Sequence, residues 1–315
     1  MPTGRSGSIR LFRFAGIDVF LHWSWFLIAA YEIQGGLRTY SSVAWNIAEY
    51  ISLFVIVTIH EFGHALACRQ VGGRANRIVL WPMGGVAFVD PPPRPGATLW
   101  SIAAGPLVNV VLLPILWVVV RGSRIAGMPS SQPDLFRLLQ AMYYINGLLL
   151  AFNILPIYPL DGGQILRSLL WFVLGRARSL MISTVLGLIG VAGFIALALY
   201  RGSVWFGALA FFVLLNCWAG FQHARVLLRL AKAPRRSGLA CPSCKNLPPI
   251  GAFWRCGRCE ESFDTFESSA QCPFCLTRYP TTSCPDCGRQ SPVGEWVTAT
   301  YAAPTLEASI SSLPK

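Results

Sequence analysis

The sequence predicts a mostly helical protein that crosses a membrane about six times and ends in a small zinc-ribbon-like domain. Of its 315 residues, 54% are hydrophobic and only 13% are charged, whereas an average soluble domain is about 25% charged. The hydrophobic excess lies upstream of residue 238, and the last quarter of the chain is polar. This distribution excludes a single soluble globule, a disordered chain and a collagen-like chain.

A helix needs roughly 20 apolar residues to cross about 30 Å of hydrocarbon, and six segments approach that length. They are residues 19–34, 46–68, 99–120, 138–174 (interrupted by prolines), 181–199 and 204–221. The first segment follows three arginines as a signal peptide would. No small-residue cleavage site follows it, so we expect a retained anchor.

The distribution of charge predicts the orientation in the membrane. Residues 1–238 hold 20 Lys or Arg against 7 Asp or Glu, and residues 239–315 hold 6 against 7. The densest basic stretches follow the second, fourth and sixth predicted spans, and basic loops stay on the cytoplasmic side. We therefore expect a multi-pass protein of the cell membrane with both termini in the cytoplasm. Arg38 and Arg121 fall in predicted outer loops, so basic residues favour the cytoplasmic loops but are not confined to them.

Two apolar stretches break the helical pattern. Residues Ile78–Val89 carry Pro82 and a Gly84-Gly85 turn signal, which predicts a membrane-embedded β-hairpin. Residues Asn153–Gly163 contain two prolines. Because non-helical backbone is tolerated at membrane depth only beside protein or a water-filled cavity, this stretch predicts a cavity.

The strongest chemical signal is His60-Glu61-Phe62-Gly63-His64, an H-E-x-x-H sequence inside the second span. Residues i and i+4 share one face of a helix, so both imidazoles can bind one Zn²⁺ while Glu61 acts as general base. The alternative is a pair of unrelated interfacial histidines with a stray acid. Ionisable residues inside a membrane are costly, which favours the metal.

A catalytic zinc site needs a third protein ligand and leaves a fourth position for water. Asp161 is the only acidic residue between Asp134 and Glu260. If the second and fourth spans run in the same direction, Asp161 and His64 lie at similar depth. Asp161 could instead be a polar cap at a helix start.

Together, HEFGH at 60–64 and NILPIYPLDGG at 153–163 resemble the site-2 protease family of intramembrane zinc metalloproteases, whose signatures are H-E-x-x-H and N-x-x-P-x-x-x-x-D-G. WPMGGVAF at 81–88 and AGPLVN at 104–109 resemble its embedded hairpin and third-helix motif. The similarity covers roughly residues 10–225, in the compact form without a PDZ domain.

The resemblance implies roles for individual residues. His60, His64 and Asp161 would bind one catalytic zinc, Glu61 would activate water, and Asn153 would hydrogen-bond the substrate near the scissile bond. His22 either lines the site or is an ordinary interfacial histidine. Asn109 is interpreted mainly as a helix-packing residue, and His223 as a residue without a site role.

The tail carries eight cysteines in four C-x-x-C pairs, which lie 11, 12 and 8 residues apart. Such clusters in a reducing compartment predict two structural Cys₄ zinc sites, each built from two C-x-x-C pairs, or knuckles. Four knuckles can combine into two sites in three ways, and the sequence leaves all three open. Redox disulfides are the competing interpretation. Filled sites would make the tail acidic, so we expect no nucleic acid as a partner; a regulatory protein or ligand is the partner expected for the tail. The cysteines are Cys241, Cys244, Cys256, Cys259, Cys272, Cys275, Cys284 and Cys287.

We therefore expect three regions: a transmembrane metalloprotease domain over residues 1–236, a zinc-ribbon-like domain over 237–290, and a disordered tail over 291–315. The resemblance implies an endopeptidase that cleaves transmembrane segments of single-span proteins in regulated intramembrane proteolysis. The alternative is a proteolytically silent metal-binding scaffold or receptor. A transporter fits less well, because its path would need carboxylates in several spans.

Overall fold

The structure, a computed structural model, describes residues 7–26, 40–81, 84–202 and 204–296. The chain forms two compact units, Met1–Gln222 and His223–Lys315, which divide inside the last long helix. In chain order the first unit contains strands β1 (Ser8–Phe14) and β2 (Ile17–His22), helix α2 (Val43–Gln70), strands β3 (Arg74–Trp81) and β4 (Gly84–Asp90), and helices α3 (Pro95–Ile125), α4 (Met128–Ser131), α5 (Pro133–Ile154) and α6 (Asp161–Arg201). It ends with the part of helix α7 (Val204–Lys232) up to Gln222.

Among the described residues, five helices are long and apolar enough to cross a membrane: α2, α3, α5, α6 and most of α7. The protein is thus a mostly helical, multi-pass membrane protein, as predicted. The predicted break after the fourth span is confirmed, because α5 ends at Ile154 and α6 begins at Asp161. Gly175, with φ 77° and ψ 169°, interrupts α6 between the predicted fourth and fifth spans.

The first predicted span, residues 19–34, is wrong at its start. Residues 19–22 belong to β2, and residues 27–34 lie outside the described part of the chain. Ile17 and Val19 are fully buried and alternate with the less buried Asp18 and Phe20, and this period of two suits a strand. The alternation is stabilised by parallel pairing with Arg77–Leu80 of β3, a partner distant in sequence.

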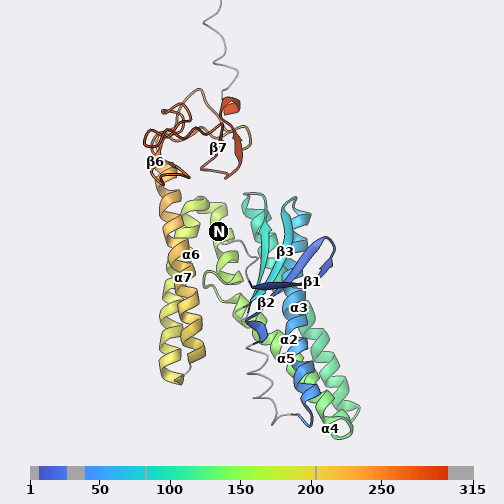
Figure 1. Ribbon diagram of the computed structural model, residues 1–315. Coiled ribbons are helices and arrows are strands. Elements are labelled where there is room, and N and C mark those ends of the chain that lie inside the picture. The colour runs from blue at the N-terminus through green and yellow to red at the C-terminus, as the bar shows by residue number, and fades with distance from the viewer. Residues whose placement is uncertain (1–6, 27–39, 82–83, 203, 297–315) are drawn as a thin grey trace, which may run out of the picture. The chain divides into compact units, whose positions relative to one another are not determined.

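The predicted hairpin is confirmed: β3 and β4 pair antiparallel, and residues 82–83 at the tip lie outside the described chain. They belong to a four-stranded sheet of order β1-β2-β3-β4, which lies beside α2 in Figure 1. Ile17, Val19, Ile78 and Leu80 of this sheet pack with Val57 and Ala65 of α2 in one buried cluster. Each fully buried aliphatic side chain contributes roughly 1.5–3 kcal/mol, so the cluster fixes the sheet against α2.

The second unit is built from four cysteine knuckles and two short hairpins, β5 (Trp254–Arg255) with β6 (Ser262–Phe263), and β7 (Thr281–Ser283) with β8 (Gln290–Pro292). The fold continues past the expected boundary at residue 290. A 3₁₀ turn over Val293–Trp296 buries the Trp296 ring completely, because that ring packs among the cysteines of one knuckle pair and Phe266. The disorder expected from residue 291 is therefore wrong up to Trp296, and residues 297–315 lie outside the described chain.

Candidate functional site

The two histidines of the H-E-x-x-H sequence lie one turn apart on α2 and face the same point. Both are buried, and their ring centroids are 4.8 Å apart. Their Nε2 atoms lie 3.2 Å from one another. The helical spacing of four residues produces this convergence, because i and i+4 side chains project over the same face.

Hydrogen bonds on the far side of each ring determine which nitrogen carries the proton. His64 Nδ1 lies 2.9 Å from the carbonyl oxygen of Ser101, and His60 Nδ1 lies 2.5 Å from Asn109 Oδ1. Carbonyl oxygens only accept, so both Nδ1 atoms donate. The amide of Asn109 is oriented by its Nδ2, which donates to Asn146 Oδ1 at 2.7 Å. Both Nε2 atoms are therefore left with free lone pairs directed at one point.

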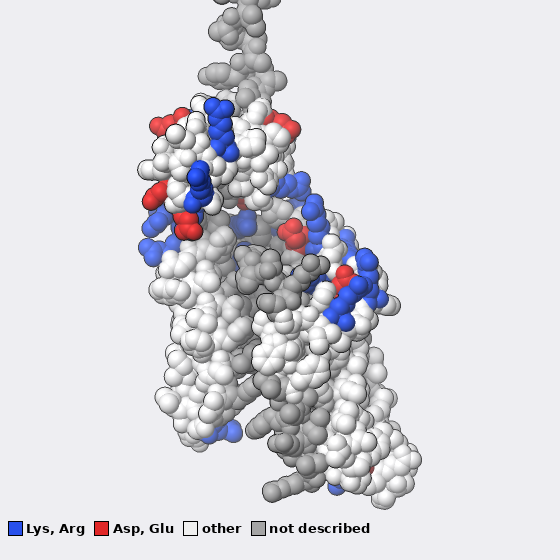
Figure 2. Space-filling view, in the orientation of Figure 1, with Lys and Arg blue, Asp and Glu red and all other residues white. Residues whose placement is uncertain are grey.

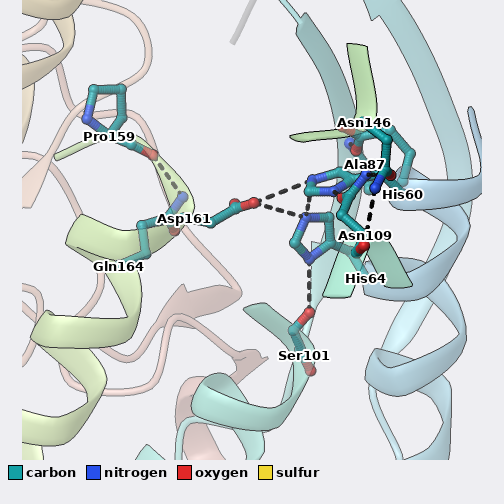
Figure 3. A network of polar contacts seen from close by, with 10 residues as sticks. His60, His64, Ala87, Ser101, Asn109, Asn146, Pro159, Asp161 and Gln164 are labelled. Atoms are coloured by element: carbon teal, nitrogen blue, oxygen red, sulfur yellow. Dashed lines mark hydrogen bonds and ion pairs between the residues drawn. The ribbon is translucent and has the colours of Figure 1, made fainter. Parts of the chain in front are cut away.

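Asp161 supplies the third acceptor from the first turn of α6. Its Oδ2 lies 3.1 Å from His60 Nε2 and 3.3 Å from His64 Nε2, and Figure 3 shows its carboxylate directed at both rings. Three acceptors with no proton to share repel one another, so the cluster fits a cation. A tetrahedral zinc with ligands at about 2.0–2.1 Å has ligand separations of about 3.3 Å, which agrees with this triangle.

The loop between α5 and α6 sets the position of Asp161. The glycines that follow Asp161 allow the loop to fold tightly: a Cβ on Gly162 would lie 2.3 Å from the Ile154 oxygen, and one on Gly163 would lie 2.3 Å from the Tyr158 nitrogen. Gln164 Nε2 donates to the Pro159 oxygen at 2.9 Å and closes the turn. The alternative of a polar cap is wrong: Leu160 holds the N-cap position and no side chain caps α6, whereas Asp161 Oδ2 faces the two histidines.

Glu61 lies beside the cluster and is also buried. Its Oε2 accepts a hydrogen bond of 2.9 Å from the backbone N–H of Ala87 on β4, while Oε1 accepts none from the described residues. Strand β4 passes very close, since a Cβ on Gly85 would lie 2.3 Å from Glu61 Cγ. The hairpin therefore orients one oxygen of this carboxylate and leaves the other free to take a proton.

The remaining predicted residues divide into two groups. Asn153 is half-buried on α5, and its side chain makes no hydrogen bond within the described chain; its role stays a prediction. His22 stacks on Trp81 at 4.2 Å and contacts Ser24 Oγ through Nδ1 at 2.5 Å; its role, at the site or at the interface, stays a prediction.

Sequence reasoning missed Asn146 and understated Asn109. Both side chains are fully buried. They form a reciprocal pair, because Asn146 Nδ2 donates back to the backbone carbonyl oxygen of Asn109 at 3.0 Å. Asn109 does pack between helices, as interpreted, and it also orients His60. An Asn inside an apolar helix is the signal that could have revealed Asn146 as well.

The tail cysteines form two tetrads. The first C-x-x-C pair joins the fourth, and the second joins the third. Neighbouring Sγ atoms lie 3.8 Å apart in the outer tetrad and 3.4 and 3.6 Å apart in the inner one. Zinc–sulfur bonds of about 2.3 Å give sulfur separations of about 3.8 Å. No disulfide joins these cysteines, and the Sγ separations suit a zinc tetrad and not an S–S bond of about 2.05 Å.

In the inner tetrad, hydrogen bonds favour the thiolate of Cys256, whereas burial and the neighbouring thiols raise the pKa of Cys259. The backbone of Cys259 and the hydroxyl of Tyr279, which lies 3.0 Å from Cys256 Sγ, together lower the pKa of Cys256 to about 5. A lowered thiol pKa favours the deprotonated form that binds metal.

Comparisons with known proteins agree with this geometry. Residues 48–126 and 124–197 match the sequence model of Peptidase family M50. A zinc metalloprotease of Methanocaldococcus jannaschii is 35% identical over 182 residues, which are 57% of this chain and 50% of that protein. Stage IV sporulation protein FB of Bacillus subtilis is 35% identical over 118 residues, 37% of this chain and 38% of that protein.

A solved structure, the site-2 protease from Methanocaldococcus jannaschii, is 28% identical, with a TM-score of 0.49, and the match covers 68% of this chain and 95% of that one. A Synechocystis protein named as a zinc metalloprotease is 28% identical over 70% of this chain and 62% of its own length. The chain thus spans about half to three fifths of the curated relatives first matched. The segment that contains the two histidines and Asp161, residues 48–197, is thus similar to peptidase family M50 and to proteins named as zinc metalloproteases.

Proposed function

We propose that this protein is a zinc-dependent endopeptidase that hydrolyses a peptide bond in the transmembrane segment of single-span membrane proteins, as in regulated intramembrane proteolysis. The observation that carries the proposal is the convergence of His60 Nε2, His64 Nε2 and Asp161 Oδ2 within 3.1–3.3 Å of each other. When bound there, zinc supplies a Lewis acid that acidifies a water molecule and polarises a carbonyl group.

The residues of the chain perform the proton transfers. Glu61 Oε1 takes the proton of the attacking water and later delivers it to the leaving amine. Ala87 N–H holds Oε2 during these steps. Asn153, whose side chain has no partner among the described residues, is available to hydrogen-bond the substrate near the scissile bond.

A transmembrane helix hides its carbonyls, so cleavage requires an extended substrate. Strand β4 is an edge of the sheet, and its Ala87 N–H points away from β3 towards Glu61. By the alternation of an antiparallel ladder, the main-chain groups of Gly85 and Val89 point the same way. This edge supports a proposal that the substrate adds as a strand beside β4 and thereby presents its backbone to the metal.

The decisive experiment compares Glu61→Gln with Asp161→Ala in the purified full chain. Glu61→Gln is expected to abolish cleavage of a model transmembrane substrate while zinc stays bound, because Glu61 is not a ligand. Asp161→Ala is expected to lower both zinc content and cleavage. If the unchanged protein and Glu61→Gln both bound zinc and neither cleaved the substrate, the site would be a metal-binding scaffold or receptor site; if both cleaved it equally, Glu61 would not be the general base.

For the tail we propose two structural zinc ions and a regulatory role on the cytoplasmic side. Three complete ligand sets predict about three zinc ions per chain. A reporter fused after Lys315 is expected to be active in the cytoplasm, because Cys₄ sites need a reducing compartment. An extracytoplasmic reporter signal would contradict the proposed orientation. It would also remove the basis for expecting Asp161 and His64 at similar depth in the membrane.

A further inference from the structure

Strand β1 shows an arrangement of side chains that neither the metal site nor the tail explains. Six of its seven residues are exposed, among them Ile9, Phe12 and Phe14, which are 53%, 42% and 62% exposed. Within the described chain β1 pairs only with β2. A soluble protein avoids an open edge strand with several exposed apolar side chains.

A bulge sorts the apolar and basic residues of β1 onto opposite faces. The register pairs Phe14 with Ile17 and Phe12 with Val19, then shifts at Leu11, so that Arg10 pairs with Phe20. Partners across a ladder point to the same face, and Ile17 and Val19 pack against α2. Phe12 and Phe14 therefore share the face towards α2, while Arg10 and Arg13 lie on the outer face. Without the extra residue, Arg10 would lie on the same face as Phe12 and Phe14.

The outer face then carries a row of charge. Arg13 is opposite Asp18 on β2, and Asp18 is opposite Arg77 on β3. Arg10 Nη2 lies 2.7 Å from Asp18 Oδ1, whereas Arg13 Nε is 3.8 Å away and the Arg77 guanidinium lies over the Phe20 ring at 5.2 Å. One carboxylate thus faces three arginines, which leaves about two positive charges for an external anion.

Farther along the same face, the residues become aromatic. His22 stacks on Trp81, which is 43% exposed, four residues beyond Arg77 on β3; Phe88 of β4, 49% exposed, lies directly opposite Arg77. In Figure 2, Lys and Arg gather over the sheet, next to the long uncharged surface of the helices. Arginines with exposed aromatic rings beside and beyond them are typical of a membrane interface, where charge meets the headgroups and rings lie at the boundary of the hydrocarbon.

We propose that the outer face of the sheet is a docking surface for an anionic phospholipid leaflet, with Arg10, Arg13 and Arg77 bound to lipid phosphates and Trp81 beside the upper acyl chains. The charge complementarity selects an anionic lipid over a zwitterionic one. Phe14 contacts Phe62 edge to face at 5.6 Å, so the docked sheet also supports the helix turn that holds the metal ligands.

The test uses the full chain, carrying Glu61→Gln so that proteolysis plays no part, in nanodiscs of phosphatidylcholine with a graded fraction of phosphatidylglycerol. One lipid or the other is brominated in separate samples, and bromine quenches the fluorescence of nearby tryptophans. The fluorescence of Trp81 is obtained by subtracting that of a Trp81→Phe protein. We expect brominated phosphatidylglycerol to quench Trp81 at a lower fraction than brominated phosphatidylcholine. Each surface arginine contributes about fivefold to this preference, so R10Q/R13Q/R77Q is expected to lose at least tenfold of it.

The matched control is R121Q/R124Q/R201Q, which removes the same charge at the C-terminal ends of α3 and α6. This variant is expected to keep the preference for phosphatidylglycerol at Trp81. Equal quenching by the two lipids, or a preference that survives R10Q/R13Q/R77Q, would overturn the proposal. If R10Q/R13Q/R77Q changed the oligomeric state and left quenching unchanged, the occupant of this face would be a second copy of the chain, which also overturns it.

Discussion

Gly105 on α3 offers the sharpest test of the metal centre because it touches a ligand without being one. A Cβ at this position would lie 2.2 Å from His64 Nε2 and 2.4 Å from Cε1. Ordinary carbon contacts are about 3.5 Å or longer, so Gly105→Ala must displace the ring by about 1 Å. The hydrogen bond from His64 Nδ1 to Ser101 on the same helix opposes that movement.

A displacement of this size exceeds the roughly 0.5 Å within which a site tolerates misplaced groups. Zinc sites with four ligands bind with about 10–16 kcal/mol, so losing one ligand costs about 3 kcal/mol, or about 100-fold in affinity. Gly122→Ala is the matched control on the same helix. It has nothing within 4 Å of the added carbon and is expected to leave zinc binding unchanged while stabilising the helix by up to about 1 kcal/mol.

Zinc retained by the full chain is measured by elemental analysis after dialysis against increasing chelator. A protein with both His60→Ala and His64→Ala gives the share held by the tail. For Gly105→Ala, the histidine-site zinc is expected to leave at about 100-fold lower chelator concentration. If Gly105→Ala and Gly122→Ala released zinc at the same point, His64 would not bind the metal through Nε2.

Two further outcomes follow from the same geometry. Asn109→Ala is expected to weaken zinc binding about 10- to 100-fold, because it removes the acceptor that orients His60; Asn216→Ala, which removes only a local bond to the Phe212 oxygen, is the control, and an equal effect would contradict the orienting role. In the tail, Cys241→Ser with Cys284→Ser changes one tetrad and is expected to remove one zinc, whereas Cys241→Ser with Cys272→Ser changes both and is expected to remove two. Equal zinc loss in the two double variants would contradict the observed pairing.

Local patterns predicted the three residues that converge at the proposed metal site. The i, i+4 spacing of His60 and His64 needs only a helix to converge, and Asp161 was found because acids are rare in the apolar half of the chain. The helix break before Asp161 followed from Pro156 and Pro159. Each of these inferences depends on a few neighbouring residues, so tertiary structure had little opportunity to overrule it.

Inferences that required distant partners succeeded less well. The strand character of residues 19–22 depends on parallel pairing with β3, and an apolar run read alone resembles a helix. The pairing of the knuckles depends on chain reversals that spacing does not determine. Asn146 became meaningful only when α5 packed beside α3 and brought its amide to Asn109.

The hydrogen-bond inventory around α2 explains why these polar groups can persist in an apolar setting. Leaving a buried polar atom unpaired costs about 1–3 kcal/mol, and here both Nδ1 atoms and the amides of Asn109 and Asn146 have partners. The atoms left without a donor are the two Nε2 atoms, Asp161 Oδ2 and Glu61 Oε1. Those are the atoms that a metal ion and a water molecule would satisfy together. Elsewhere among the described residues, buried polar atoms such as both side-chain atoms of Asn46 and Ser183 Oγ also have no partner, but only at this cluster do several such acceptors converge on one point.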